Sequence, residues 1–248
     1  INIAIMLLII IGGIGFLVWE DICKHKWRIR EYRTQSKVVL IVTAALIVLP
    51  AIYFFFFQFG NLPIGERILA SLFQSVTPRT AGFNTANLTA ISDTGLYLMI
   101  ILMLIGGSPG STAGGMKTTT IAVLFSSAFS VFRKKDNAEL VKRRIDDETV
   151  KTASAIFIMY ITLFLLGGMT ISAIENLPIT SCLFETASAV GTVGLTLGIT
   201  PTLGIASKLI LIFSMFFGRV GGLTLIYATF GTNKKQLAKL PTDTIAVG

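Results

Sequence analysis

Two glycine-centred stretches decide the fold: Thr77-Pro78-Arg79-Thr80-Ala81-Gly82-Phe83-Asn84 and Val190-Gly191-Thr192-Val193-Gly194-Leu195-Thr196. Each follows a segment of about three helical turns, which is too short to cross a bilayer. Each such segment lies between two longer apolar runs. Lipid offers no partner for backbone N–H and C=O groups, so non-helical backbone at membrane depth must be buried in protein or line a water-filled path. The pair of stretches therefore predicts a conduit.

The composition supports a membrane location. Of 248 residues, 53% are apolar and only 14% are charged, which is typical of a polytopic membrane protein and leaves no room for a large soluble module. We expect no disulfide between Cys23 and Cys182, because they lie in segments expected on opposite sides of the bilayer. The first residues are apolar without a basic segment before them, so the chain looks cut within or just before a membrane helix.

Glycines recur at a fixed spacing. Gly82 and Gly194 are 112 residues apart, and so are Gly106 and Gly218. Each repeat reads as a long helix, a short helix, a glycine stretch and a long broken helix, although the second short helix needs one extra residue before its glycine. The expected fold class is all-α integral membrane, with repeated helix–pore loop–helix units. The expected segments are 1–22, the last helix of a preceding repeat; 36–135 and 150–232, one repeat each; and 233–248, a cytoplasmic tail.

Basic residues set the orientation. Of 21 lysines and arginines, 16 lie in three groups, at 24–37, at 133–151 and in the tail. By the positive-inside rule these segments are cytoplasmic, and the two glycine stretches enter the membrane from outside. The charge of +8 is thus explained by topology and by contact with anionic membrane lipid. It gives no indication of nucleic-acid binding.

The long helix that begins near Asp93 breaks at Gly106-Gly107-Ser108-Pro109-Gly110-Ser111-Thr112-Ala113-Gly114-Gly115. No ordinary helix continues through five glycines and a proline in ten residues. A small, polar, flexible segment below the glycine stretches is suited to obstruct a path and move aside, so we expect a gate. Its expected residues are Gly106, Gly107, Ser108, Pro109, Gly110, Ser111, Thr112, Gly114 and Gly115, together with Arg219. The alternative is a kink that only serves helix packing.

Three basic residues, Arg79, Lys117 and Arg219, fall at membrane depth, where an ionisable group normally faces an interior and finds a partner. Glu185, on the opposite short helix, is the acidic residue expected to pair with Arg79 and brace the glycine stretches. Arg219 directly follows Gly218, the residue that matches Gly106, and is expected to face the first break, holding its carbonyls.

Two enzyme-like patterns do not carry chemistry. Gly106-Gly107-Ser108-Pro109-Gly110 fits Gly-x-Ser-x-Gly, but Pro109 lacks the N–H that an oxyanion hole needs, and His25, the one histidine, lies in a basic loop. Met116 interrupts the ending that a phosphate-binding loop requires. No histidine or cysteine cluster has metal-ligand spacing. We expect no enzymatic activity.

The Thr-small-Gly-apolar core of both stretches resembles the Thr-Val-Gly-Tyr-Gly loop of potassium channels, in which carbonyls replace the water shell of the ion. We therefore expect the carbonyls of Thr80, Ala81, Gly82, Thr192, Val193 and Gly194 to line a potassium filter. Both threonine hydroxyls would add oxygens at its inner end. The C-terminal ends of the short helices would favour a cation. The alternative is that the glycines only allow close packing.

These stretches, together with Gly106-Gly107-Ser108-Pro109-Gly110-Ser111-Thr112 and Gly218-Arg219-Val220-Gly221, resemble the Trk/Ktr/HKT superfamily of potassium transporters, and the bacterial Ktr membrane subunit most of all. The resemblance covers the whole chain. It implies four repeats around one pore, of which this chain holds the third, the fourth and the last helix of the second, with Gly12-Gly13-Ile14-Gly15 as the break in that helix. Ala113 departs from the glycine usual there, and the first two repeats are absent.

The resemblance also implies a potassium-uptake subunit in the cell membrane that forms a homodimer and is regulated by cytoplasmic nucleotide-binding subunits. Whether sodium or protons assist is left open. A second interpretation remains, in which the broken helices belong to a secondary transporter for an organic solute or to a membrane scaffold. Carbonyls at helix C-terminal ends favour a dehydrated cation over an anionic solute.

Overall fold

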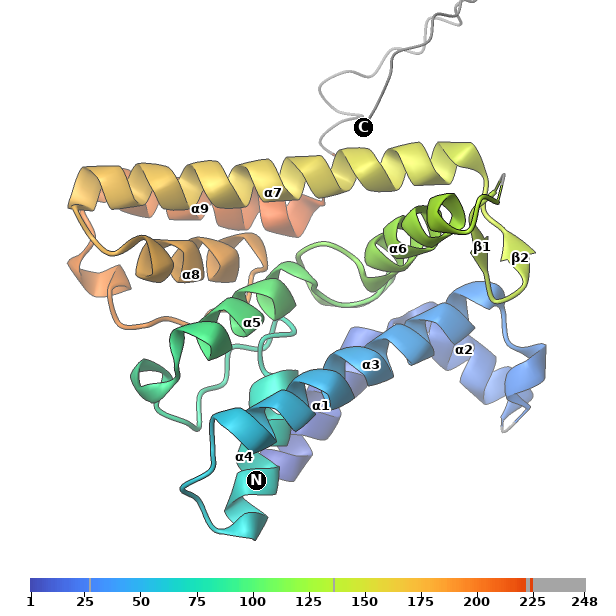
Figure 1. The fold of residues 1–248 in the computed structure, drawn as a ribbon, viewed down its shortest axis with the longest axis horizontal. Helices are drawn as coiled ribbons and strands as arrows, with labels where there is room; N and C mark the ends of the chain where they lie inside the picture. The colour runs from blue at the N-terminus through green and yellow to red at the C-terminus, as the bar shows by residue number, and fades with distance from the viewer. Residues whose placement is uncertain (27, 136, 222–223, 225–248) are drawn as a thin grey trace, which may run out of the picture.

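The computed structural model is built almost entirely of helices (Figure 1) and describes residues 1–26, 28–135, 137–221 and 224. This confirms the expected all-α class. The elements are α1 (Asn2–Ile14), α2 (Phe16–His25), α3 (Thr34–Phe57), α4 (Ile64–Val76), α5 (Asp93–Leu104), α6 (Thr118–Phe132), α7 (Asp147–Glu175), α8 (Ile179–Val190) and α9 (Ile205–Val220), with short 3-10 turns at Ile29–Glu31, Leu88–Ala90 and Thr200–Thr202 and a hairpin of β1 (Glu139–Leu140) and β2 (Arg143–Arg144).

Two of the described helices, α3 and α7, are each long and apolar enough to cross a membrane. The pair α1 and α2 forms a third candidate span, bent by 94° at Gly15. Gly15 has φ +94°, a conformation that glycine adopts at little cost. At the start of α7, Asp146 accepts a hydrogen bond from the backbone N–H of Thr149 at 3.2 Å, which caps the helix.

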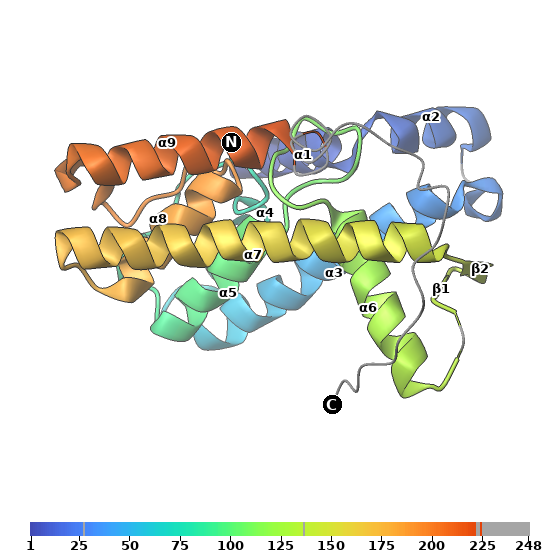
Figure 2. The same ribbon diagram turned by 90° about the horizontal axis from the view of Figure 1, so that it is seen from above.

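The two repeats contact each other through α5 and α8 and through α6 and α7. Within the first, α3 packs on α4, and within the second, α7 packs on both α8 and α9. The two views show α7 and α9 side by side, with α8 beneath them (Figures 1 and 2). α5 lies against α8, while α6 leaves this layer and contacts α3 and α7. Buried Met99 and Met103 of α5 meet Phe184 of α8 and Tyr160 of α7 in the largest core cluster.

Several boundaries differ from the expected ones. The first apolar run breaks at Gly15, within the expected break, and the loop from 133 to 151 contains an unforeseen hairpin, β1–β2. Both short helices occur where they were expected, as α4 and α8. The expected tail at 233–248 and most of the chain after Gly221 lie outside the described residues.

Candidate functional site

The two glycine stretches share one backbone geometry. Thr80 and Gly82 have φ of +59° and +70°, and Thr192 and Gly194 have φ of +51° and +94°. The residue between each pair is not in this region. A β-branched residue at positive φ is a conformational outlier, and such strain concentrates at functional sites. When successive residues alternate between left-handed and right-handed φ values, successive peptide groups point the same kind of atom toward one side of the chain.

Four N–H groups in the two stretches donate hydrogen bonds to the chain at the C-terminal ends of the preceding short helices. Ala81 and Gly82 each donate to Thr77 O at 3.3 Å, and Val193 donates to Ser188 O at 2.8 Å. The N–H of Gly194 donates to Ser188 Oγ at 3.1 Å. Among the described residues, no hydrogen bond ends on the carbonyl oxygens of the six residues expected to form the filter, which are Thr80, Ala81, Gly82, Thr192, Val193 and Gly194. The six residues therefore offer carbonyl oxygens as free acceptors, while the N–H groups of Ala81, Gly82, Val193 and Gly194 are already bonded.

The two stretches touch each other. A Cβ added to Gly82 would lie 2.2 Å from Val193 O and 3.3 Å from the carbonyl carbon of Gly194. No side chain fits between them, so only glycine allows this approach. By contrast, a Cβ on Gly194 would meet nothing within 4 Å. The first stretch also borders a cavity of about 250 Å³ that Thr80 and Ala81 line together with α1 and Thr112.

The loop at 106–115 is fixed at both ends by backbone hydrogen bonds. Gly106 N donates to Met116 O at 2.9 Å, and Met116 N donates to Leu104 O at 3.2 Å. The hydroxyls of Ser108 and Thr118 lie 3.0 Å apart in a buried pair. Lys117 Nζ donates to Ala113 O at 2.6 Å. These hydrogen bonds give the loop a defined conformation in this structure.

The α1–α2 bend and the C-terminal end of α9 converge on this loop. From the bend between α1 and α2, Phe16 N donates to Gly110 O at 3.1 Å, and Gly13 O accepts from Ser108 N at 3.0 Å. From the end of α9, Gly218 O accepts from Gly115 N at 3.1 Å. Arg219 Nη1 donates to Thr112 O at 2.6 Å, the carbonyl contact expected of this arginine.

The loop also contacts the second glycine stretch. A Cβ on Gly114 would lie 2.1 Å from Thr192 Oγ1, and this hydroxyl is buried without a hydrogen-bond partner among the described residues. A Cβ on Gly115 would lie 3.4 Å from Gly191 Cα. The 106–115 loop and the carbonyl-lined stretch are thus in direct van der Waals contact.

The structure does not form the expected brace between Arg79 and Glu185. The carboxylate of Glu185 accepts hydrogen bonds from Thr196 Oγ1 at 2.6 Å, Thr200 Oγ1 at 2.6 Å and Leu197 N at 2.9 Å. It therefore holds the chain that follows its own glycine stretch. Arg79 turns the other way.

The guanidinium of Arg79 faces α1 and α3. Its Nη2 donates to Thr43 Oγ1 at 3.4 Å, and Gly13 lies beside the same nitrogen. Nε and Nη1 have no partner among the described residues, although only 4% of this residue is exposed.

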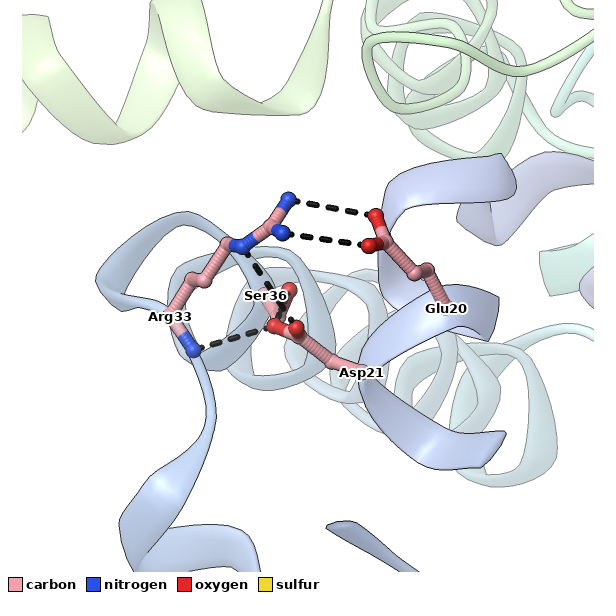
Figure 3. Close-up of polar contacts among 4 residues, drawn as sticks. All are labelled: Glu20, Asp21, Arg33 and Ser36. Carbon is pink, nitrogen blue, oxygen red and sulfur yellow. Dashed lines mark hydrogen bonds and ion pairs between the residues drawn. The ribbon is translucent and has the colours of Figure 1, made fainter. Parts of the chain in front are cut away.

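Sequence reasoning missed a polar cluster on the expected cytoplasmic side, shown in Figure 3. Asp21, 1% exposed, accepts from Ser36 Oγ at 2.6 Å and from Arg33 N at 3.0 Å. The Arg33 guanidinium donates to both oxygens of Glu20 at 3.2 Å. The cluster ties α2 to the start of α3. The signal was the acidic pair directly after an apolar run, inside an otherwise basic segment.

A comparison with protein-family models matches residues 1–235 to the model described as TrkH, cation transport protein. The chain belongs to the TrkH family. Among curated TrkH-like relatives, the potassium/sodium uptake protein NtpJ of Enterococcus hirae is 39% identical, aligned over 97% of this chain and 56% of that protein. The Ktr system potassium uptake protein B of Bacillus subtilis is 35% identical over 96% of this chain and 54% of that protein.

The fold of a solved TrkH family member agrees. The crystal structure of the potassium transporter TrkH from Vibrio parahaemolyticus superposes with a TM-score of 0.75 at 19% identity, over 94% of this chain and 52% of that one. The chain thus spans about half the length of the relatives it matches. The enzyme-like patterns thus lie in a chain of the TrkH family, whose model is described as a cation transport protein.

Proposed function

We propose that this chain supplies two walls of a potassium-selective pathway. One observation carries the proposal: the N–H groups of Ala81, Gly82, Val193 and Gly194 are bonded at the ends of the preceding short helices, while the carbonyls of Thr80, Ala81, Gly82, Thr192, Val193 and Gly194 accept no hydrogen bond among the described residues. Carbonyl oxygens are the groups that replace the hydration shell of a potassium ion. The C-terminal ends of α4 and α8 lead directly into the stretches, where the helix dipole favours a cation.

The 106–115 loop, with Arg219, acts in this proposal as the gate. Support comes from its position, since it touches Thr192 on one side and bonds to Arg219 on the other. The arginine adds a positive charge beside the path and holds the loop through Thr112 O. Opening requires this bond, and those to Gly13 and Gly218, to break.

Further parts of the proposal concern the whole protein. Residues 1–22 complete a second repeat, 36–135 and 150–232 are the third and fourth, and 233–248 form a cytoplasmic tail. The basic loops face the cytoplasm of a cell membrane. Two copies of the protein form a homodimer that works with cytoplasmic nucleotide-binding regulatory subunits. The name of one relative includes sodium, which supports sodium as a second transported or coupling ion. A role as a solute transporter or scaffold has less support, since the carbonyl arrangement suits a bare cation.

The test uses the full-length protein in cells that need added potassium to grow. Gly82→Ala places a methyl group against Val193 O and strains a positive φ, so we expect uptake at low potassium to fall about tenfold or more. Gly194→Ala strains φ alone and should also lower uptake. Gly65→Ala is the matched control, because a Cβ there meets nothing within 4 Å. Normal uptake by the Gly82 variant, at normal expression, would overturn the proposal.

A further inference from the structure

A groove between α3 and α6 has the shape and polarity of a lipid site. It encloses about 590 Å³, within the range of small-molecule sites in proteins. Its long walls are apolar, with Val42 and Ala45 of α3 facing Ala122 and Phe125 of α6. Phe125 and Phe129 are 62% and 57% exposed, as expected for side chains that face the hydrocarbon of a membrane.

One end of the groove is polar and basic. After α6 the chain turns back, with Lys135 N donating to Ser130 O at 2.9 Å, and this places Arg133, Lys135 and Glu139 along the rim. Ser126 Oγ donates to Glu139 O at 2.8 Å, so the β1–β2 hairpin is fixed across this end. The polar end is therefore built by contacts within the chain.

Among the described residues that line the rim, positive charges outnumber negative ones. Lys135 Nζ lies 2.7 Å from Glu139 Oε2, and Arg144 is the strand partner of Glu139 in the hairpin. Arg133 adds a second positive charge at the groove itself. An anionic group is the complement of this rim.

We propose that the groove binds one anionic phospholipid of the cytoplasmic leaflet, with its phosphodiester between Arg133 and Lys135 and an acyl chain between α3 and α6. The division into an apolar slot and a basic end matches the division of a phospholipid. Basic pockets between membrane helices on the cytoplasmic side recognise anionic headgroups in this way. The choice of leaflet rests on the orientation given under Proposed function; the binding itself does not.

The experiment measures lipid retention by the full-length protein in uncharged detergent, using native mass spectrometry with added phosphatidylglycerol or phosphatidylcholine. We expect the protein to retain phosphatidylglycerol preferentially. Arg133→Gln with Lys135→Gln should weaken phosphatidylglycerol retention by about fivefold per charge removed and leave phosphatidylcholine unchanged. Lys24→Gln with Arg30→Gln removes two exposed cytoplasmic charges outside the groove and should leave retention unchanged.

Two further variants sharpen the test. Glu139→Gln removes the competing carboxylate and should strengthen phosphatidylglycerol retention by about fivefold. Ala45→Phe fills the slot and should reduce retention of both lipids. Equal retention of the two lipids by the unmodified protein, or equal losses in the Lys24/Arg30 control, would overturn the proposal. An Ala45→Phe variant whose oligomeric state changes while its lipid retention stays the same would also overturn the proposal. None of these readouts needs ion flux, so failure here is distinct from failure of the proposed pathway.

Discussion

Gly218 of α9 packs directly on the backbone of Val190 at the end of α8: a Cβ on Gly218 would lie 1.9 Å from Val190 O. The same glycine offers its own carbonyl to Gly115 N at 3.1 Å and to the hydroxyl of Tyr160 at 3.3 Å. The helix that carries Arg219 is therefore held against the second glycine stretch by a contact that leaves no room for a side chain.

Gly218→Ala should separate α9 from α8, because the methyl group meets backbone atoms, which cannot move aside by a change of rotamer as a side chain can. Overpacking of this kind costs about 1–3 kcal/mol. We expect a lower midpoint of thermal unfolding for the full-length protein in detergent. Gly60→Ala is the control, since a Cβ there meets nothing within 4 Å. Equal midpoints for the two variants would contradict the packing described.

Arg219→Ala should speed potassium uptake. The variant removes a positive charge from the path and breaks the 2.6 Å bond that holds Thr112 O, so the 106–115 loop loses one of its fastenings. Arg219→Lys keeps the charge without the planar guanidinium and should fall between the two. Uptake of rubidium as a tracer, normalised to protein in the membrane, measures the effect. Unchanged or slower uptake in the alanine variant would count against a gate at this loop.

Thr192→Val should separate function from stability. The substitution keeps the β-branched shape and removes a buried hydroxyl that has no partner among the described residues. Loss of an unsatisfied polar group leaves stability equal or higher. If Thr192 Oγ1 contributes an oxygen to the ion, uptake at low potassium falls about tenfold. A variant with normal uptake would show that the hydroxyl serves no ion.

Glu185→Gln should loosen the chain after the second glycine stretch. Three donors converge on this carboxylate at 2.6, 2.6 and 2.9 Å, and hydrogen bonds to a charged group contribute about 1.5–3 kcal/mol each. We expect lower thermal stability and weaker selectivity for potassium over sodium. Glu185→Lys should abolish uptake altogether. A stable, fully active lysine variant would remove the structural role assigned to Glu185.

Asp21→Asn should lower the thermal stability much more than Glu20→Gln, although the two residues are adjacent. Asp21 is 1% exposed and bonded to Ser36 and Arg33, so the variant disturbs a buried network and should cost about 1–3 kcal/mol. Glu20 forms a half-exposed ion pair with Arg33, which is worth about 0–1 kcal/mol. Thermal unfolding of both variants in parallel measures the difference, and equal effects would argue against a buried clamp at Asp21.

The features predicted from the sequence are those that depend on local backbone chemistry. The 112-residue spacing of the glycines led to equivalent stretches, and Thr80 and Thr192 do share an unusual positive φ. The short helices α4 and α8 followed from their length and apolar pattern. The contact of Arg219 with the 106–115 loop followed from its place beside Gly218, which matches Gly106 in the first repeat.

The features that sequence reasoning missed depend on distances between elements. Arg79 and Glu185 were paired by charge alone, but the Arg79 side chain, just after α4, reaches Thr43, and the Glu185 side chain of α8 reaches Thr196. The 94° bend at Gly15 was expected as a break without a direction, since a glycine permits a turn and does not fix its angle. The β1–β2 hairpin has too few residues to leave a pattern.

The oxygen acceptors of the two stretches are peptide carbonyls and a threonine hydroxyl, and these groups neither gain nor lose a proton in the range where proteins remain folded. A carboxylate ring of equal size would lose its charge in an acidic medium. The pathway proposed for this chain therefore keeps the same electrical character from acid soil to alkaline seawater.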